Sequence, residues 1–463
     1  MPLILGTNSI KDTGYNVANS LRFNDGDSPY LSQTISASTG KIFTLSFWMK
    51  KSTDGSNNGI FGLTSDGNTD DYIEVATKSG SYGLDIQFSN GSGGTYLRRR
   101  TNRVFRDTSA WYHVVVRFDS TQGTASNRFR LYINGVQETS IDVDSSAADV
   151  PQDYVTDLAT NGATLNIGRM VGASNYYDGY LCEFVLVDGS SLAPTSFGEF
   201  DEDTPTIWKP KDVSDLTFGT NGFYLDFEDS SALGNDAAGS NNFTANNLAA
   251  TDQSTDTCTN NFCTWNPLAN YDDGVAFSEG NLVAMSGTND QWDGGRATMG
   301  FSQGIWYFEC LFVAGVSTQY IGVQDESAGF TGSSPHNQNG TTVFYNNSGG
   351  EIRKDGSATT NDYGTFSSSE VAGIAIDADN FTISVYKGGS AIVNAYALST
   401  TRTGFLFPFT TNMMNGDGVK VNFGSPPYSE SGGNTDANGY GNFSMAVPSG
   451  YYSLNTKNLA EFG

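Results

Sequence analysis

Two acidic residues near the middle of the chain are the first candidates for chemistry. Asp226 and Glu228 stand two positions apart in Phe-Tyr-Leu-Asp-Phe-Glu, so an extended strand would place both carboxylates on one face. Sugar hydrolysis of the retaining type needs such a pair roughly 5–5.5 Å apart. No third acid follows at the same-face spacing, and short motif fragments often arise by chance. We therefore rank a glycan-cleaving enzyme last among the functions considered and expect no catalytic residues.

His113 is the second candidate for chemistry. It is one of two histidines in the chain, and strand alternation places it on the outward face of Trp-Tyr-His-Val-Val-Val-Arg-Phe-Asp. No serine or cysteine nucleophile motif stands near it, so a catalytic triad is not indicated. The cysteines show no zinc-finger spacing. Cys258 and Cys263 could be bridged locally, and reduced thiols are the default expectation.

Acidic turns are the candidate metal ligands. Asp25 and Asp27 lie in one turn, and Asp70 and Asp71 lie in another. Carboxylates are hard oxygen ligands of the kind that Ca²⁺ prefers. Acidic residues are also ordinary turn formers, and neither spacing is diagnostic. We expect no required cofactor. The one metal hypothesis is Ca²⁺ at the turn with Asn24, Asp25 and Asp27 or at the turn with Asp66, Asp70 and Asp71.

Exposed aromatic residues beside amides are the candidate ligand site, because rings stack on sugar faces while amides bond to hydroxyl groups. One cluster stands in a glycine-flanked loop of the first half, and one stands in the second half. The residues are Asn175, Tyr176, Tyr177 and Asp178, and then Gln291, Trp292 and Asp293. The alternative is that these rings pack inward or at a subunit contact.

Charge and hydropathy exclude two classes of partner. The formal net charge is −26, from 24 basic and 50 acidic residues, so a polyanion such as DNA would be repelled. The basic cluster at 98–106 is better explained by local ion pairs or a subunit contact. No apolar segment approaches the ~20 residues that span a bilayer. The N-terminus lacks the pattern of a signal peptide, so we expect no membrane insertion and synthesis in the cytoplasm.

Two stretches with period-two alternation show which elements must position these residues. Residues 111–136 and 371–390 each read as strand, polar turn, strand and glycine turn, which is typical of an antiparallel hairpin. With 54 glycines and few long helical patterns, the chain is expected to be all-β. The fold class that we expect is two concanavalin-like or jelly-roll β-sandwiches, joined by an irregular connector, with extended terminal segments.

The expected boundaries divide the chain into five parts. Residues 1–19 form an N-terminal docking arm, and 20–208 form the first sandwich. Residues 209–270 form an ordered connector that packs along the domains. Residues 271–430 form the second sandwich, and the glycine- and serine-rich residues 431–463 form a surface tail.

Motifs of the first sandwich resemble laminin-G/concanavalin A-like lectin domains. They are Phe43-Thr-Leu-Ser-Phe-Trp-Met-Lys, Trp111-Tyr-His-Val-Val-Val-Arg-Phe-Asp, Leu131-Tyr-Ile-Asn-Gly-Val, Leu165-Asn-Ile-Gly-Arg and Tyr177-Asp-Gly-Tyr-Leu-Cys-Glu-Phe. The resemblance covers about residues 20–195 and implies a two-sheet jelly roll, often with one Ca²⁺ at its rim. This family includes β-glucanases, but their Glu-x-Asp-x-x-Glu strand is not found here.

The second sandwich resembles a SPRY domain, a fold that usually binds proteins. The motifs are Gly304-Ile-Trp-Tyr-Phe-Glu, Tyr320-Ile-Gly-Val, the hairpin from Ile374 to Tyr386, and Val421-Asn-Phe-Gly.

The chain as a whole is similar to tail-fibre-type virion proteins of tailed phages, especially marine phages. The shared segments are Met1-Pro-Leu-Ile-Leu-Gly-Thr-Asn, the run from Phe223 to Asp236, and Ser453-Leu-Asn-Thr-Lys-Asn-Leu. The resemblance implies a structural protein of the phage particle, made in the bacterial host cytoplasm. It would contact other virion proteins through its arm, form a homo-oligomer, with a trimer as the family-level expectation, and bind a host surface glycan or receptor. The alternative is a capsid-decorating or head-fibre protein.

Overall fold

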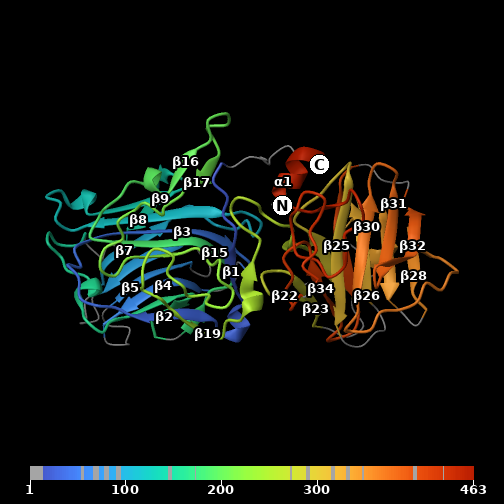
Figure 1. Cartoon of the computed structure of the whole chain (residues 1–463), viewed down its shortest axis with the longest axis horizontal. Helices are drawn as coiled ribbons and strands as arrows, with labels where there is room; N and C mark the ends of the chain where they lie inside the picture. Colours follow the sequence, from blue (N-terminus) through green and yellow to red (C-terminus); the bar gives the residue numbers. More distant parts are fainter. Residues whose placement is uncertain are drawn as a thin grey trace. The chain divides into compact units, whose positions relative to one another are not determined.

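The described residues divide into two β-rich units, 14–259 and 260–463. The computed structural model (Figure 1) describes residues 14–53, 57–65, 72–77, 83–89, 95–143, 149–172, 174–271, 274–287, 292–313, 319–329, 334–346, 349–399, 404–430 and 432–463. In these ranges the secondary structure is strand apart from short 3-10 turns and one α-helix, α1 (Thr456–Phe462). The all-β prediction is confirmed.

The first unit packs two antiparallel sheets face to face. One sheet runs β10 (Val136–Gln137), β9 (Phe129–Ile133), β8 (Tyr112–Asp119), β3 (Ile42–Lys51), β15 (Gly179–Asp188), β1 (Ser20–Phe23) and β20 (Gln253–Ser254), with β18 (Phe223–Leu225) also on β15. The other runs β11 (Ile141–Val143), β7 (Thr95–Thr101), β6 (Leu84–Ser89), β5 (Tyr72–Thr77), β4 (Asn58–Thr64), β12 (Thr164–Ile167), β2 (Tyr30–Thr34) and β19 (Thr244–Asn246). Two hairpins accompany them, β13 (Arg169–Met170) with β14 (Ser174–Tyr176) and β16 (Gly198–Phe200) with β17 (Trp208–Pro210).

Strand alternation builds the core between these sheets. On β8, Val114, Val116 and Phe118 are buried in the main apolar cluster, as the period-two pattern predicts. Phe118 stacks on Phe43 of the neighbouring strand β3 with ring centroids 5.1 Å apart. The hairpin from β8 to β9 therefore forms part of the wall against which the second sheet packs.

The two outer faces of this sandwich differ in character. Outward-facing Val115 and Val185 are buried in an apolar cluster with Phe197, Val213 and Tyr224, which the chain contributes from its later residues. The outer face of the opposite sheet instead carries polar side chains in register across neighbouring strands. These are Ser32, Asn166, Glu74, Gln87 and Arg98. The chain thus covers one outer face with its own apolar residues and places hydrogen-bonding groups on the other.

The expected connector does not stand apart from the sandwiches. Its strands β18, β19 and β20 pair with β15, β2 and β1, so they extend both sheets of the first unit. Phe243 lies in the core of that unit, and Trp265 lies in the core of the second. The division between the units falls after Thr259, inside the predicted connector.

The second unit repeats the two-sheet plan. One sheet runs β21 (Trp265–Asn270), β24 (Asp293–Ala297), β33 (Leu406–Asn412), β26 (Gln319–Asp325), β27 (Thr341–Asn346), β28 (Glu351–Lys354) and β29 (Ser357–Ala358). The other runs β22 (Val275–Ser278), β23 (Val283–Ser286), β34 (Gly418–Asn422), β25 (Ile305–Val313), β30 (Val371–Asp377), β31 (Thr382–Lys387) and β32 (Ser390–Ala397), and β35 (Tyr452–Ser453) pairs with β25 in parallel.

The last residues are not the surface tail that their composition indicated. Leu454 and Leu459 are buried in the core of the second unit, and Phe443 is buried against Tyr307. Glu309 accepts the backbone N–H groups of Ser444 and Met445 at 2.9 and 2.8 Å. Glycine, serine and asparagine here serve the turns between these anchors rather than a disordered end.

At the other end, the described part of the expected arm packs on the first unit. The Tyr15 hydroxyl lies 3.2 Å from that of Tyr224, and the Val17 N–H donates to Thr259 at 3.1 Å. Residues 1–13 lie outside the described residues. Within the described ranges, no helix is long and apolar enough to cross a lipid bilayer.

Candidate functional site

The first candidate site is a group of three half-buried side chains in the first unit, Tyr30, Arg169 and Tyr176. The guanidinium carbon of Arg169 lies 3.6 Å from the centroid of the Tyr30 ring, and the rings of Tyr30 and Tyr176 are 6.3 Å apart. Arg169 donates to Asn166 Oδ1 at 3.1 Å, while its Nε is buried with no hydrogen-bond partner in the described structure. Rings held beside planar donors are what a sugar-binding surface requires.

Two glycines explain why the hairpin that carries this group can lie on strand β4. A Cβ atom at Gly59 would lie 2.1 Å from the backbone nitrogen of Met170. A Cβ atom at Gly62 would lie 3.3 Å from the carbonyl oxygen of Arg169. Because both positions lack a side chain, β13 and β14 approach the outer face of the sheet closely. Arg169 and Tyr176 are paired across this hairpin.

The structure divides the predicted Asn175–Asp178 cluster between surface and core. Asn175 is exposed and Tyr176 half-buried, so they remain at the candidate site. Tyr177 is fully buried, donates to the Lys50 carbonyl oxygen at 3.2 Å and packs edge-on against Phe23. Asp178 is also buried. The prediction that Tyr177 and Asp178 bind a ligand was therefore wrong, because both side chains are buried where the chain enters the strand that starts at Gly179.

The second candidate site is an aromatic stack on the outer face of one sheet of the second unit. His336 lies between Trp292 and Tyr320, at centroid distances of 4.2 and 4.3 Å. Tyr320 stacks on Tyr345 at 4.2 Å, and Arg353 lies 5.2 Å from the centroid of Tyr345. Trp292 and Tyr345 are half-buried, so their rings reach the surface. Burial, aided by the Arg353 charge, lowers the pKa of His336 to about 4, so His336 itself is neutral at pH 7.

Of the two predicted residues that the structure describes here, Trp292 joins the stack and Asp293 does not. Asp293 is fully buried on the opposite side of the strand, where it accepts the Ser286 hydroxyl at 2.6 Å. Asp293 was therefore wrong as a surface ligand-binding residue, since neighbouring strand residues point to opposite faces. Gln291 lies outside the described residues.

A third feature is an open pocket of about 370 Å³ in the first unit. Leu233 and Phe243 are buried in its wall, and the exposed Asn235 and Asn242 lie beside them. Asn242 Oδ1 accepts the Asp236 N–H at 2.9 Å, which leaves its amide nitrogen for a ligand. No charged residue lines this pocket within the described structure, so it suits an uncharged polar ligand.

His113 is fully buried rather than displayed on an open strand face. Its imidazole lies between Trp48 and Trp208, with centroid distances of 4.8 and 5.9 Å. The Trp208 indole N–H donates to Nδ1 at 2.9 Å, and Nε2 lies 2.9 Å from the Ser46 hydroxyl. Since the indole can only donate, neutral His113 carries its proton on Nε2 and donates to Ser46. This polarity is opposite to that of a serine activated by a general base.

The predicted carboxylate pair does not share a strand. Strand β18 ends at Leu225, and the Asp226 carboxylate accepts the Glu228 N–H at 3.1 Å across Phe227, whose φ is +58°. The two acids therefore form a turn, and the expected same-face arrangement was wrong. A different acid is perturbed: burial raises the pKa of Glu183 to about 8, although the Tyr224 hydroxyl donates to it at 2.9 Å.

The structure describes only some of the acidic residues predicted as calcium ligands. Asp25 and Asp27 lie in an exposed 3-10 turn, where Asp27 accepts the Asn24 amide at 2.8 Å. Partial burial, with the nearby Asp27 charge, raises the pKa of Asp25. Asp66, Asp70 and Asp71 lie outside the described residues. No group of three His, Cys, Asp or Glu side chains is placed to hold a metal within the described ranges.

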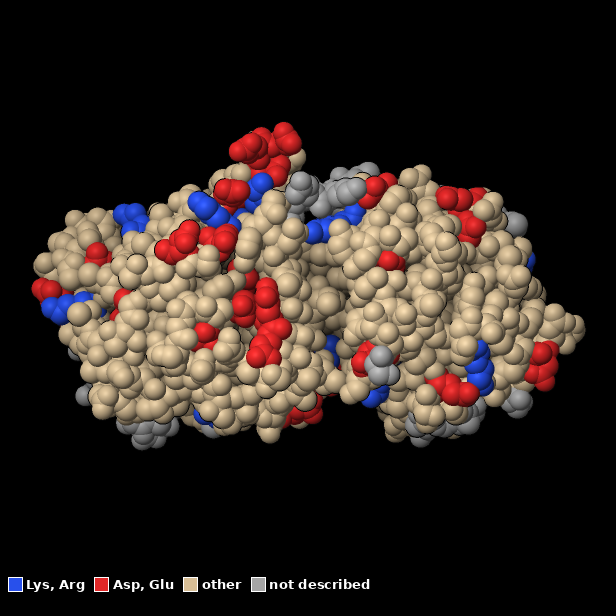
Figure 2. All heavy atoms as spheres, viewed as in Figure 1, with Lys and Arg blue, Asp and Glu red and all other residues tan. Residues whose placement is uncertain are grey.

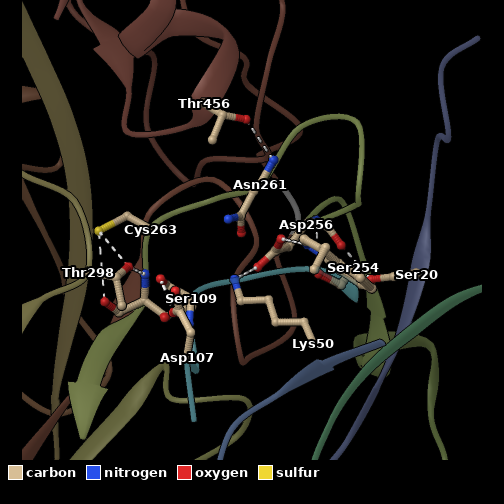
Figure 3. Close-up of polar contacts among 12 residues, drawn as sticks. Ser20, Lys50, Asp107, Ser109, Ser254, Asp256, Asn261, Cys263, Thr298 and Thr456 are labelled. Carbon is tan, nitrogen blue, oxygen red and sulfur yellow. Dashed lines mark hydrogen bonds and ion pairs between the residues drawn. The ribbon is translucent and has the colours of Figure 1, made fainter. Parts of the chain in front are cut away.

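Ion pairs account for the basic cluster and for one buried lysine. Arg98 and Arg100 both donate to Asp85, at 3.0 and 2.8 Å, as the local ion-pair interpretation requires. Figure 3 shows the buried pair in the first unit, in which Lys50 Nζ lies 2.7 Å from Asp256. The Ser20 hydroxyl donates to the Asp256 carbonyl oxygen at 2.6 Å, which attaches strand β1 to the same residue (Figure 3). All four cysteines are free thiols, so Cys258 and Cys263 are not bridged.

Comparisons with known proteins agree with the fold of the first unit. Residues 24–193 match the family described as the concanavalin A-like lectin/glucanases superfamily. The chain is therefore shown to contain a concanavalin A-like sandwich. No match was found among curated protein sequences.

Several solved structures resemble parts of the chain. The SPRY domain of human HERC1 is 17% identical, with 34% of this chain and 96% of that chain covered and a TM-score of 0.27. A heptameric SAP-like pentraxin from Limulus polyphemus is 18% identical, with coverage of 39% and 80% and a TM-score of 0.28. A protein from Bacteroides ovatus, proposed to bind carbohydrate, is 16% identical, with coverage of 50% and 59% and a TM-score of 0.35.

Sequence reasoning missed Tyr30, Arg169, Tyr320 and Tyr345. Tyr30 and Tyr176 stand 146 positions apart, and they meet only because strand β2 and strand β4, on which the β13–β14 hairpin lies, both pair with β12. Alternation did carry one signal, because Tyr30 and Tyr320 stand next to core residues of their strands and must face outward.

Proposed function

We propose that this protein is a non-enzymatic, glycan-binding component of a phage particle, of the tail-fibre or host-adhesion type. It would recognise uncharged sugars on the host surface, mainly through Tyr30, Arg169, Asn175 and Tyr176. The fold of the first unit is one that includes carbohydrate-binding proteins, which supports this substrate class.

The contrast between the two outer faces of the first sandwich carries the proposal. One face is covered by the chain's own Phe197, Val213 and Tyr224, and such coverage leaves no room for a ligand. The other carries polar side chains, of which Ser32 and Gln87 are half-buried and Asn166 and Glu74 are buried, and the tyrosine–arginine group lies beside them. A sugar ring could stack on Tyr176 while its hydroxyl groups bond to Arg169 and Asn175, which is a usual division of labour in such sites.

The aromatic stack around Trp292 and the uncharged pocket beside Asn242 offer two further weak sites. Single sugar contacts of this kind are individually weak. Several sites on one chain, repeated over an oligomer, multiply into useful avidity when the target surface is dense.

Charge supports neutral rather than acidic glycans. The net charge is −26, and Figure 2 shows a face of mostly uncharged residues on which acidic side chains gather at the turn between β16 and β17. The residues of that turn include Asp201, Glu202 and Asp203. A sialylated or sulfated glycan would meet an unfavourable potential.

Binding to an array of bacterial surface glycans tests the proposal. The wild-type protein and two variants, Tyr176→Ala and Trp292→Ala, would be applied as labelled proteins. We expect wild-type binding to neutral glycans and a drop of about tenfold, or 1.4 kcal/mol, for Tyr176→Ala. Phe381→Ala removes a ring that is 45% exposed, and it is the matched control, because this residue lies in the turn between β30 and β31, in the sheet of the second unit that does not contain β24.

Two outcomes would contradict the proposal. Equal binding by wild type and all three variants would place recognition elsewhere, and no binding to any glycan would remove the substrate class. Immunogold labelling of intact particles tests the virion role separately: gold on the tail supports adhesion, gold over the head supports capsid decoration, and unlabelled particles exclude both.

A further inference from the structure

A layer of buried polar side chains crosses one end of the second sandwich, and the proposed function does not use it. Asp293, Asn412, Gln319 and Asn346 stand on four neighbouring strands, β24, β33, β26 and β27, and each is fully buried. They are directly paired in register, Asp293 with Asn412, Asn412 with Gln319, and Gln319 with Asn346. Directly paired residues have Cβ atoms about 4.5–5.5 Å apart on one face, so these side chains stand side by side.

This layer faces the space between the two sheets. The Ser286 hydroxyl of the opposite sheet donates to Asp293 Oδ2 at 2.6 Å. The Gln319 amide nitrogen donates to the carbonyl oxygens of Val313 and Gly418 at 2.6 and 3.1 Å, and both residues belong to the opposite sheet. These bonds fix the orientation of the Gln319 amide, so its oxygen must point away from them.

Two amides in this layer are not satisfied by the protein. Gln319 Oε1 has no hydrogen-bond partner in the described structure, and neither Oδ1 nor Nδ2 of Asn412 has one there. Asn346 is the contrast, because it exchanges hydrogen bonds with the backbone of Phe366 at 2.8 and 3.1 Å. Buried amides left without partners are costly and rare, and such groups commonly bind an ion or ordered water.

The donor set suits a hard cation. Asp293 supplies a carboxylate, and Gln319 and Asn412 supply amide oxygens, which are the oxygen ligands that Ca²⁺ prefers in proteins. Asp417 adds a second buried carboxyl group at this end, because its carbonyl oxygen accepts the Ser286 N–H at 2.8 Å. A Cβ atom at Gly274 would lie 2.5 Å from Asp293 Oδ1, so the absence of a side chain there lets the carboxylate pack closely against this backbone.

We propose that Asp293, Gln319 and Asn412 bind one Ca²⁺ between the sheets of the second unit, with water completing the coordination and accepting from Asn412 Nδ2. The ion would neutralise the buried charge and hold β24, β33 and β26 together at this end. Trp292 directly precedes Asp293, so the ion would also fix the strand end that presents the aromatic stack. That last consequence rests on the proposed function, whereas the binding of Ca²⁺ does not.

Calcium binding to the full chain tests the proposal. The protein would be stripped with EDTA and titrated with CaCl₂ or MgCl₂ by calorimetry, and its thermal unfolding would be followed in parallel. We expect a Ca²⁺-dependent rise of several degrees in an unfolding midpoint, with little effect of Mg²⁺. Asp293→Asn should weaken Ca²⁺ binding at least about tenfold and abolish the rise.

Three controls separate the alternatives. The double variant Asp25→Asn/Asp27→Asn should keep the Ca²⁺ response, and loss of the response there would place the ion in the first unit and overturn the proposal. Asp362→Asn, an exposed acid of the second unit, should also keep it. If Asp293→Asn fails to fold, metal analysis of purified wild type remains decisive, because the absence of bound Ca²⁺ after dialysis against it refutes the site.

Asn412→Leu distinguishes an ion from water. With an ion, this variant loses Ca²⁺ binding and becomes less stable than wild type in CaCl₂. If it instead matches or exceeds wild type in stability with and without Ca²⁺, the layer holds only water and the proposal fails. A failure of glycan binding alone leaves each of these readouts unchanged.

Discussion

The indole N–H of Trp208 donates to Nδ1 of His113 at 2.9 Å, which ties the β16–β17 hairpin to the start of β8. The bond fixes the tautomer of a histidine that is 1% exposed. Protonation of Nδ1 would break this bond and place a charge between two tryptophan rings. Burial accordingly lowers the pKa of His113 to about 3.

His113 should make the first unit sensitive to mild acid. The pKa is about 3 in the folded state against an ordinary value of 6.5, so the unfolded chain binds a proton first as the pH falls. The contribution of neutral His113 to the free energy of unfolding is complete above pH 6.5. It is lost between pH 6.5 and 3, by up to about 1.4 kcal/mol per pH unit. Urea unfolding from pH 7 to 4 should show a smaller loss for His113→Gln than for wild type. Parallel curves would contradict this assignment.

Glu183 should act in the opposite direction. Burial raises its pKa to about 8 from an ordinary value of 4.5, so the folded state retains a proton that the unfolded state releases. The contribution of protonated Glu183 to the free energy of unfolding is complete below pH 4.5 and is lost as the pH rises to about 8. We expect Glu183→Gln to flatten the stability profile between pH 5 and 8 and to be the more stable protein at pH 8, measured by urea unfolding. Glu228→Gln, which removes the charge of an exposed acid near Glu183, is the control.

Adjacent tyrosines should separate binding from stability. Tyr177→Ala removes a fully buried ring and its bond to Lys50, and should cost about 3–5 kcal/mol of unfolding free energy. Tyr176→Ala should change that free energy by less than about 1 kcal/mol. Calorimetric unfolding of both variants, beside the glycan measurements, checks the contrast. A larger loss of stability from Tyr176→Ala would mean that this ring is structural.

Glu309 should hold the C-terminal segment on the second unit. Its carboxylate accepts the N–H groups of Ser444 and Met445 and the Tyr307 hydroxyl, although burial raises its pKa. Glu309→Ala leaves those donors unpaired, so we expect a destabilisation of about 2–4 kcal/mol and early proteolytic cleavage within 430–450. Limited proteolysis with mass spectrometry locates the cut. An unchanged digestion pattern would show that Phe443 and Leu454 suffice to hold the segment.

The regular parts of the fold were predictable because they depend on neighbours in sequence. Alternation on β3 and β8 placed Phe43, Val114 and Phe118 correctly in the core. The same rule placed His113 on the outer side but could not show that Trp208, 95 positions later, would cover it. It also failed at Tyr176 and Tyr177, where β14 gives way to β15 and the direction of the side chains changes.

Irregular backbone conformation was the other feature that could not be predicted from the sequence. Glu183 lies at a register shift in β15 with a φ of +49°, and this distortion turns its carboxylate toward Tyr224. The local sequence Leu-Cys-Glu-Phe-Val does not predict such a bulge, because a bulge depends on how two strands pair. The buried layer of Asp293, Gln319 and Asn412 likewise exists only once three strands are in register.

The position of β35 has a consequence for how the protein is made. This strand pairs with β25, about 150 residues earlier, and Leu459 just beyond it completes the core of the second unit. During synthesis, β25 leaves the ribosome long before its partner, so the second unit must wait with an unfilled core. In the part of the chain that the structure describes, the sheets of the first unit contain no strand later than β20, so this unit can close earlier. Translation therefore imposes an order on assembly, with the concanavalin A-like sandwich formed first and the second unit exposed to aggregation until its final turn is made.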